Sequence, residues 1–392
     1  MIYGVLNLSF WGYVIIFFAF TQLTIISVTL YLHRYQTHRA IELHPIVSHI
    51  FRYWLWLTTA MVTKEWVAVH RKHHATVETE DDPHSPVIHG IKKLLLEGVE
   101  LYRVGISDQE LVEKYGAGTP NDWIERNVYQ KYSRFGPVIM LLLNLILLGI
   151  PGLTVWALQM AWIPFFAAGV INGVGHYWGY RNYEVADASR NIIPWGILLG
   201  GEELHNNHHA FGSSAKFSTK WWEVDFGWGV ICLLSWFGLA KVKRLAPHID
   251  IQPNKRRLDL ESVKAILANR FQVLASYYKQ VTLPVFRAEK QRVAVRERSL
   301  FKRAGKLLLL RDQSLLSSSS KQRLKQLLAK REHLQIVYQF RLQLQELWGK
   351  TTVNPKELLE SLQLWCKRAE ATGIEVLRKF ADDLHGVVLT KA

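Results

Sequence analysis

Two long stretches without any charged residue constrain this chain more than any other feature of its sequence. No Lys, Arg, Asp or Glu occurs in residues 1–33, and none occurs in residues 135–180. The second stretch is 46 residues long, which is enough for two membrane crossings of about 20 residues joined by a tight turn. The sequence therefore predicts an integral membrane protein.

We predict three crossings, at about residues 7–32, 136–156 and 159–180. The first apolar run lacks the basic leader and small-residue cleavage site of a removable signal peptide, so we interpret it as a crossing. In the second charge-free stretch, turn-forming residues reverse the chain, namely Gly149, Pro151 and Gly152. The weaker apolar stretch at 45–63 contains His49 and Arg52, and we predict that it lies at the membrane interface instead of crossing.

The charge of the chain is concentrated at its C-terminal end. From residue 251 onward there are 28 Lys and Arg against 13 Asp and Glu, so this segment carries the whole net charge of +15. Positively charged segments that follow membrane spans stay in the cytoplasm. A basic tail can also contact anionic headgroups or nucleic acid, or simply be solvated. Aliphatic residues recur there at helical spacing, which predicts a bundle of soluble helices. Two cysteines, Cys232 and Cys366, are too few and too far apart for a disulfide framework.

Nine of the sixteen histidines lie in four groups close in sequence. They are His33 and His38; His70, His73 and His74; His176; and His205, His208 and His209. Spacings of three and four residues place imidazoles on one helical face, whereas an adjacent pair points two rings in different directions. Imidazole suits iron, copper, zinc and nickel. Nine ligands exceed the needs of one tetrahedral ion, so we predict two metal ions that share this set.

The histidine groups border the apolar spans, where ionisable groups are costly and usually functional. If they serve one site they lie on one side of the membrane, which is why 45–63 is not predicted to cross. Five acidic residues are candidates to orient the rings: Glu42, Glu65, Asp82, Glu202 and Glu203. The other seven histidines are not predicted to be ligands: His44, His49, His84, His89, His248, His333 and His385.

Together these features predict an all-α protein. Its first domain, residues 1–245, is an integral membrane helical bundle with a cytoplasmic cap that carries the histidine groups. Its second, residues 246–392, is a basic soluble helical region. The stretches 192–201 and 221–240 are apolar and rich in tryptophan, and we predict that they lie on the membrane surface.

The histidine-rich segments resemble the membrane-bound acyl desaturases, the family of stearoyl-CoA desaturase. The resemblance covers about residues 5–245, and it is particularly evident with the bacterial branch, which acts at the Δ9 position of acyl groups on coenzyme A or phospholipid. The matching segments are His33-Arg34-x-x-x-His38-Arg39; Glu65-Trp66-x-x-x-His70-Arg71-x-His73-His74; Asp82-Pro83-His84; Asn172-x-x-x-His176; Gly179-Tyr180-Arg181-Asn182-Tyr183; and Glu202-Glu203-Leu204-His205-Asn206-Asn207-His208-His209.

This resemblance implies that the nine grouped histidines bind two iron ions, that Asn172 supports one iron through a water, and that O₂ is the oxidant. It also implies a kinked tunnel for the acyl chain and no catalytic side chain beyond the ligands. The chain has no His-Pro-Gly-Gly haem motif and no Gly-x-Gly-x-x-Gly dinucleotide motif. A ferredoxin- or cytochrome-type donor with its reductase is therefore expected, at the cytoplasmic face of a bacterial inner membrane. One departure is that only one span, and not two, fits before the first histidine box.

The C-terminal region has a resemblance of its own, to the helical end of a bacterial transposase family. It is carried by Leu362, Trp365, Ala369, Gly373, Ile374, Leu377, Phe380, Ala381 and Leu384. No accompanying carboxylate triad is evident, so nucleic acid is not an expected partner. Two other functions stay open for the whole chain, a hydroxylase with the same metals and a non-catalytic protein that stores or senses metal. The sequence also leaves open acyl-CoA or phospholipid as substrate, the chain length and the oligomeric state.

Overall fold

The computed structural model describes residues 2–247, 249–252, 255, 257–293, 301, 307–308, 316–349 and 354–389. These form two compact units. Unit 1 is Met1–Tyr180 with Asp187–Ala246, and unit 2 is Arg181–Ala186 with Pro247–Ala392. His248, which was not expected to be a ligand, lies outside the described residues. The chain is mainly helical, as predicted, with a few short strands that were not.

Unit 1 begins with a long apolar helix. Helix α1 (Phe10–Ser27) starts where the Ser9 side chain accepts a hydrogen bond from the Gly12 N–H at 3.3 Å, and it runs directly into the π-helix η1 (Val28–Thr37). Farther along, α8 (Ile150–Ile163) continues as the π-helix η3 (Pro164–Val174). These two continuous helices, of 28 and 25 residues, are long and apolar enough to cross a bilayer.

The helices in the region of the second and third predicted crossings have bounds other than those predicted for the crossings. Helix α7 (Phe135–Leu148) ends eight residues before the predicted limit, and α8 begins at Ile150. Gly149 adopts a φ of +70°, and a Cβ there would collide with the Ile2 carbonyl, so the turn needs glycine. Because α7 has 14 residues, it is shorter than the roughly 20 needed to cross. Two of the three predicted crossings therefore have helices of sufficient length in the described part of the chain.

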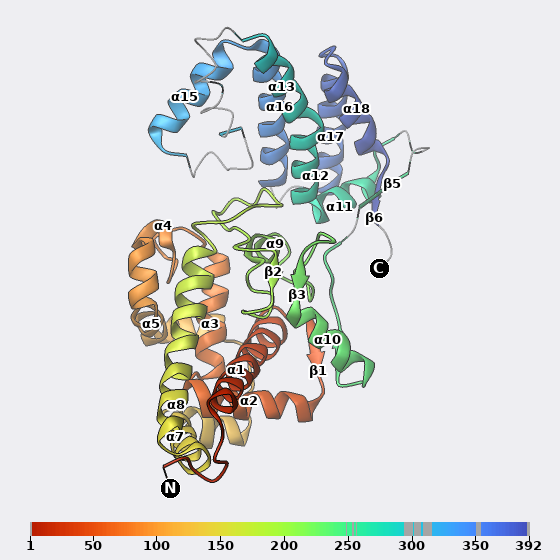
Figure 1. Cartoon of the computed structure of the whole chain (residues 1–392). Coiled ribbons are helices and arrows are strands. Elements are labelled where there is room, and N and C mark those ends of the chain that lie inside the picture. The colour runs from red at the N-terminus through yellow and green to blue at the C-terminus, as the bar shows by residue number, and fades with distance from the viewer. Residues whose placement is uncertain are drawn as a thin grey trace. The chain divides into compact units, whose positions relative to one another are not determined.

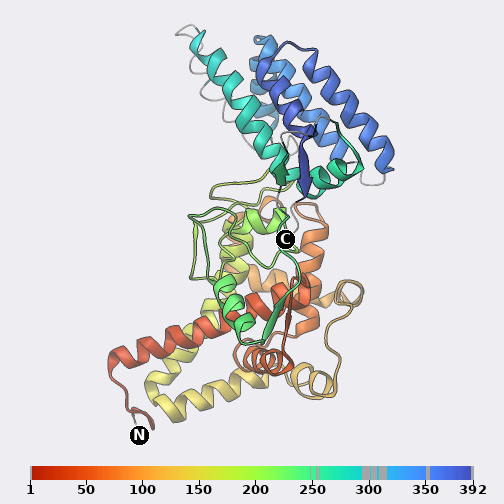
Figure 2. The same ribbon diagram turned by 90° about the vertical axis from the view of Figure 1, so that its right-hand side faces the viewer.

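Unit 1 exposes several large apolar side chains at one of its ends. The N-terminal end of α1 and the turn between α7 and α8 lie at the same end of unit 1 (Figure 2), where the Val5 N–H donates to the Ile146 carbonyl. Around this turn, Leu142, Ile146 and Ile150 are more than half exposed. Large exposed apolar patches of this kind mark surfaces that contact membranes or partners.

Helix α2 (Pro45–Thr59) lies in the stretch predicted to be interfacial. It has apolar side chains on its exposed side and a charged residue, Arg52, on its buried side. It exposes Ile46, Ile50 and Tyr53, and its opposite side packs into the core. The buried Arg52 is held by Asp122 and Glu125, at 2.7 and 2.8 Å. This pairing anchors the polar segment after α6 to α2 and neutralises a charge that could not stay buried alone.

Figure 1 shows the remaining elements of unit 1, among them α3 and α9, which carry two of the histidine groups. The helices are α3 (Thr63–Ala75), α4 (Pro86–His89), α5 (Ile91–Ser107), α6 (Gln109–Tyr115), η2 (Glu125–Gln130), α9 (His205–Ala210) and α10 (Phe226–Trp236). Strand β1 (Ile41–Leu43) pairs antiparallel with β4 (Ala240–Val242), and β2 (Trp195–Gly196) pairs parallel with β3 (Val224–Asp225). Helix α5 packs closely along η3 because Gly98 faces the small residues Ala168 and Gly169.

Unit 2 is a helical bundle with its own apolar core. Its helices are α11 (Leu260–Ala268), α12 (Arg270–Tyr277), η4 (Tyr278–Thr282), α13 (Leu283–Gln291), α15 (Ser318–Ala329), α16 (Glu332–Gly349), α17 (Pro355–Glu370) and α18 (Glu375–His385). Strands β5 (Ile249–Ile251) and β6 (Val387–Leu389) pair antiparallel. The core includes Tyr277, Trp365 and Phe380, whose rings contact one another.

Candidate metal centre

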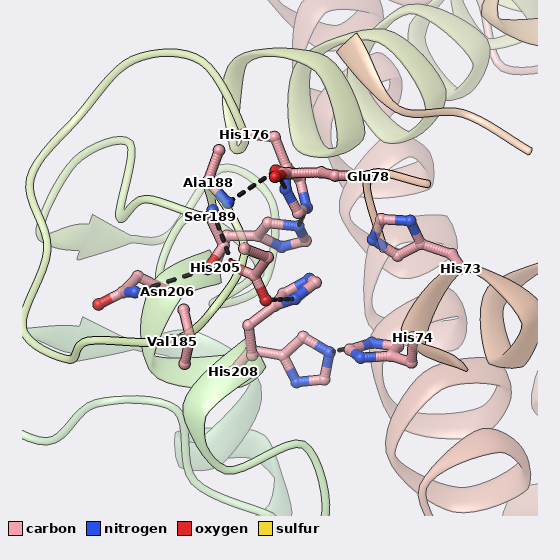
Figure 3. Close-up of polar contacts among 12 residues, drawn as sticks. His73, His74, Glu78, His176, Val185, Ala188, Ser189, His205, Asn206 and His208 are labelled. Carbon is pink, nitrogen blue, oxygen red and sulfur yellow. Dashed lines mark hydrogen bonds and ion pairs between the residues drawn. The ribbon is translucent and has the colours of Figure 1, made fainter. Parts of the chain in front are cut away.

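The structure brings the nine predicted histidine ligands together within unit 1 and separates them into two groups. The first group, of five, is His33, His38, His70, His74 and His208. The second group, of four, is His73, His176, His205 and His209. Within each group the candidate ligand atoms all lie within 4.8 Å of one another. Figure 3 shows His73 and His74 from α3 facing His176, His205 and His208.

The π-helix η1 explains how His33 and His38 enter the same group. A spacing of five residues would place two side chains about 140° apart around an α-helix, which turns about 100° per residue. In a π-helix the hydrogen bonds run from residue i to i+5, so the two side chains lie on one face. The His38 N–H donates to the His33 carbonyl at 3.0 Å, and the two rings are 4.8 Å apart.

Adjacent histidines are divided between the groups, as the sequence predicts. His74 belongs to the first group and His73 to the second, and His208 and His209 divide in the same way. One turn of α3 and one of α9 therefore each serve both groups.

Four imidazoles are oriented by carboxylates. The Nδ1 atoms of His33, His73, His176 and His209 lie 2.7, 2.9, 3.2 and 3.0 Å from carboxylate oxygens. The respective partners are Glu202, Asp82, Glu78 and Asp187. Because an ionised carboxylate can only accept, each Nδ1 carries the proton and donates it. The Nε2 lone pair of each ring is thereby directed into the site, which is the usual arrangement around metal-bound histidines.

Two observations show that the residues are suited to metal binding. First, ring nitrogens of different histidines face one another: Nε2 of His208 lies 3.1 Å from Nε2 of His33 and 2.9 Å from Nε2 of His74. Imidazole nitrogens bind such metals at about 2.1 Å, so two ligands at right angles stand about 3 Å apart. Second, Nε2 of His73 and of His209 is buried without a hydrogen-bond partner.

The protonation of the site follows from its burial. Burial, followed by the charges of neighbouring histidines, holds the pKa of six of the nine imidazoles well below the usual range: His38, His70, His74, His205, His208 and His209. Burial alone would raise the pKa of Asp82, but the hydrogen bond and charge of His73 lower it to about 2. The site therefore contains neutral imidazoles and an ionised carboxylate, the forms that bind metal.

These pKa directions predict how the metal-free protein responds to acid. The six imidazoles stay neutral when folded but protonate near pH 6.5 when unfolded, so below that pH the unfolded state binds more protons. We expect the thermal midpoint of the apoprotein to be level from pH 8 to 7 and to fall steeply below about pH 6.5, each group costing up to about 1.4 kcal/mol per pH unit. A midpoint that is flat or rising from pH 7 to 5.5 would contradict this. Asp82 acts only in the more acid range, below about pH 4.

Of the five acids predicted to orient the rings, Asp82 and Glu202 do so. Glu42 does not, because it lies exposed on β1 and pairs with Lys243 at 3.1 Å. Glu203 accepts the backbone N–H groups of Leu199 and Gly201 instead, and burial raises its pKa to about 7.

Two orienting acids, Glu78 and Asp187, were not predicted. Neither has a spacing to its histidine that local sequence could reveal, since the partners are 98 and 22 residues away. His84, which was not predicted as a ligand, is buried and stacks on His73 with ring centres 4.5 Å apart.

A cavity of about 980 Å³ lies beside the first histidine group. Its lining includes His33, His70 and Glu202 at the site and Glu65, one of the predicted orienting acids. Along the continuous helix α8–η3, the lining runs from Gln159 to Asn172, a rise of about 20 Å. Asn172, the predicted partner of a metal-bound water, faces this cavity one helical turn before His176. The first histidine group thus borders a cavity that follows the apolar α8–η3 helix.

Comparison with known proteins agrees with this geometry. A family model described as fatty acid desaturase matches residues 8–231. Icosanoyl-CoA 5-desaturase of Limnanthes douglasii is 33% identical over 59% of this chain and 65% of its own length. Delta-9 desaturase-like 5 protein of Arabidopsis thaliana is 30% identical over 60% of this chain and 78% of its own. The sn-1 stearoyl-lipid 9-desaturase of Anabaena variabilis is 31% identical over 56% of this chain and 79% of its own.

A second family model, described as transposase, matches residues 263–387 and covers most of unit 2. Among the described residues of this range, Glu370, Asp382 and His385 gather closely, and both carboxylates are exposed. The desaturase match covers more than half of the chain and contains all nine grouped histidines. The chain therefore belongs to the fatty acid desaturase family.

Proposed function

We propose that this protein is an O₂-dependent di-iron desaturase that introduces a cis double bond, at the Δ9 position, into a long acyl chain. Residues 1–245 would form the desaturase domain. The observation that carries the proposal is the cavity of about 980 Å³ beside the first histidine group, whose His33 and His70 form part of its lining. The side of the cavity formed by α8 and η3 is largely apolar, with Met160, Ile163 and Ala167 in its lining, so it suits a hydrocarbon chain better than a compact polar substrate.

The proposed reaction balances with an external source of electrons. Two neighbouring methylenes each lose one hydrogen atom, and a carbon–carbon double bond forms between them. O₂ is reduced to two waters, which requires the two hydrogens from the substrate together with two electrons and two protons. The iron ions, when bound, would supply the oxidising power to break unactivated C–H bonds. We propose that a ferredoxin- or cytochrome-type donor with its reductase delivers the electrons.

The chain's own residues prepare the site for this reaction. The four carboxylates hold their imidazoles in the tautomer that directs Nε2 inward. Burial keeps the remaining imidazoles neutral and excludes bulk water. The cavity wall, which includes Trp66 and Val69, would hold two methylenes beside the histidines. No other side chain is proposed as a general acid, base or nucleophile.

The names of the relatives leave the carrier of the acyl chain open, because they include an acyl-CoA enzyme and an acyl-lipid enzyme. Either carrier fits the proposal. The two long apolar helices and the exposed apolar side chains support a membrane location. We propose a bacterial inner membrane with the metal centre and the basic C-terminal region on the cytoplasmic side, following the positive-inside rule.

The direct test is a lipid profile. The chain is expressed with an electron donor in a host that makes no unsaturated acids aerobically, and double bonds are located by mass spectrometry. New Δ9 monoenes that require oxygen would support the proposal, whereas monoenes at another position would revise only its regiochemistry. Hydroxylated chains would assign the protein as a hydroxylase. Unchanged lipids, despite bound iron and an active donor, would point to a non-catalytic metal-binding protein.

A substitution at the distal part of the cavity should change the chain length that is accepted. Met160 lines the cavity about 18 Å along the helix from Asn172. We expect Met160→Trp to fill part of this space and to shift products toward shorter acyl chains, measured by the lipid profile. Leu158→Trp is the matched control, since Leu158 is 49% exposed on the same helix and outside the cavity lining. An unchanged chain-length distribution in Met160→Trp would show that the acyl chain does not reach this part.

A further inference from the structure

Unit 2 contains one short segment from the middle of the chain. Residues Arg181–Ala186 belong to it, although the rest of unit 2 begins at Pro247. Three consecutive side chains of this segment are buried: Tyr183, Glu184 and Val185 are 2%, 4% and 3% exposed. A segment with this degree of burial is fixed by its surroundings and is not a free surface loop.

The segment is held by a buried ion pair. Arg341, on α16, is 1% exposed and donates from Nε and Nη2 to Oε2 of Glu184, at 3.1 and 2.9 Å. Its Nη1 also donates to the Leu308 carbonyl at 3.4 Å. Removing one partner of such a pair leaves a charge in a place where water cannot solvate it.

The chain that leaves this segment goes directly to the second histidine group. Asp187, three residues after Glu184, accepts the Nδ1–H of His209 at 3.0 Å. The next residue, Ala188, donates its N–H to Oε1 of Glu78, the same oxygen that accepts Nδ1–H of His176 at 3.2 Å. Figure 3 shows Ala188 and His176 meeting at Glu78. Two of the four imidazoles in the second group thus depend on backbone or side chains within four residues of Glu184.

We infer that the Glu184–Arg341 pair positions Asp187 and Ala188, so that the C-terminal region contributes to metal binding by the second histidine group. Glu184 and Arg341 are positioning residues here, since neither touches a candidate ligand in the described contacts. The inference rests on the proposed function insofar as it requires that the two histidine groups bind iron. It gives the basic C-terminal region a role within the desaturase, independent of any DNA chemistry.

The test measures iron binding by the full-length protein in detergent. Apoprotein is titrated with Fe²⁺ under anaerobic conditions, and iron per chain and the two dissociation constants are determined. We expect Arg341→Leu to bind one of the two irons about 10–100-fold more weakly, as when an orienting partner of a metal ligand is lost. The other iron should bind as in the unmodified protein. If Arg341→Leu does not accumulate as folded protein, Glu184→Gln carries the same expectation.

Two further variants separate positioning from general damage. The double variant Glu184→Leu/Arg341→Leu replaces the pair by apolar side chains, which often preserves a buried contact, so it should recover most of the lost affinity. Glu289→Gln is the control, because Glu289 is a buried acid of unit 2 that contacts Arg331 and His333 but lies outside the 181–188 segment. Normal iron affinity in both Arg341→Leu and Glu184→Gln, or equal weakening in Glu289→Gln, would overturn the inference. Failure of the unmodified protein to bind iron would instead refute the proposed metal centre.

Discussion

Replacement of His208 by alanine is expected to abolish desaturation. The Nε2 atom of His208 lies between those of His33 and His74, so its loss removes a ligand from the middle of the first group. Loss of a residue that only orients a ligand lowers metal affinity or activity about 10–100-fold, and loss of the ligand itself should cost more. We expect less than about 1% of the normal monoene yield and a reduced iron content per chain.

The control for this prediction is His49→Ala. His49 lies on the exposed side of α2 and outside both histidine groups. Its replacement should leave monoene yield and iron content unchanged. If His208→Ala and His49→Ala gave the same monoene yield and the same iron content, the first group would not hold a metal needed for the reaction. The thermal midpoints of both apoproteins show whether a lower yield comes from unfolding.

The spacing of the histidines in the sequence could predict which of them gather, but it could not predict all of the backbone geometry that brings them together. His70 and His74, four residues apart, enter one group because an α-helix brings such positions together. His33 and His38 are five residues apart, and only the π-helical geometry of η1 places them on one face. Nothing in the run Val28–Thr37 distinguishes π- from α-helix by periodicity alone. The sequence therefore identified both residues, while their geometry depended on tertiary packing.

The carboxylates that orient the imidazoles were even harder to predict from local sequence than the histidine positions. Asp82 and Glu202 could be proposed because both lie near histidine groups in sequence, and Asp82 accepts from the nearby His73 at 2.9 Å. Glu202 instead accepts from His33, which is 169 residues away. Glu78 is also near a group but orients His176, which is 98 residues away. Pairing across that distance is decided by the fold and leaves no periodic signal.

In the hairpin of α7 and α8, the helix length expected for a membrane crossing led to a predicted end later than the observed helix end, although the sequence contained a turn residue. Gly149 was predicted as a turn residue, and the structure places the turn there. The predicted crossing nevertheless continued to residue 156, because a crossing was assumed to need about 20 residues. The positive φ of Gly149 and the proline at the start of α8 end the helix earlier than that length would require.

Replacement of Arg34 by methionine is expected to cost more stability than any other single change considered for unit 1. Arg34 is completely buried, and its guanidinium donates to both carboxylate oxygens of Asp225 at 2.9 and 3.2 Å. It also donates to the carbonyls of Ala215 and Gly200 and lies 3.9 Å over the ring of Phe217. Breaking such a pair leaves a buried carboxylate unbalanced, at a cost of about 3–5 kcal/mol. The measurement is the thermal midpoint and the half-life at fixed temperature in detergent.

The geometry of Arg34 also predicts which replacements will fail to restore stability. Arg34→Lys keeps the charge, but one ammonium cannot reach Asp225 and two carbonyls in the way a planar guanidinium does, so it should recover only part of the loss. Arg39→Met is the matched control, because Arg39 also follows a histidine of the first group yet is exposed; it should change stability by less than about 0.5 kcal/mol. Full recovery by Arg34→Lys would mean that charge alone matters. Partial recovery with lower iron content would mean that Arg34 also fixes the loop at Gly200, two residues before Glu202, and through it the orientation of His33.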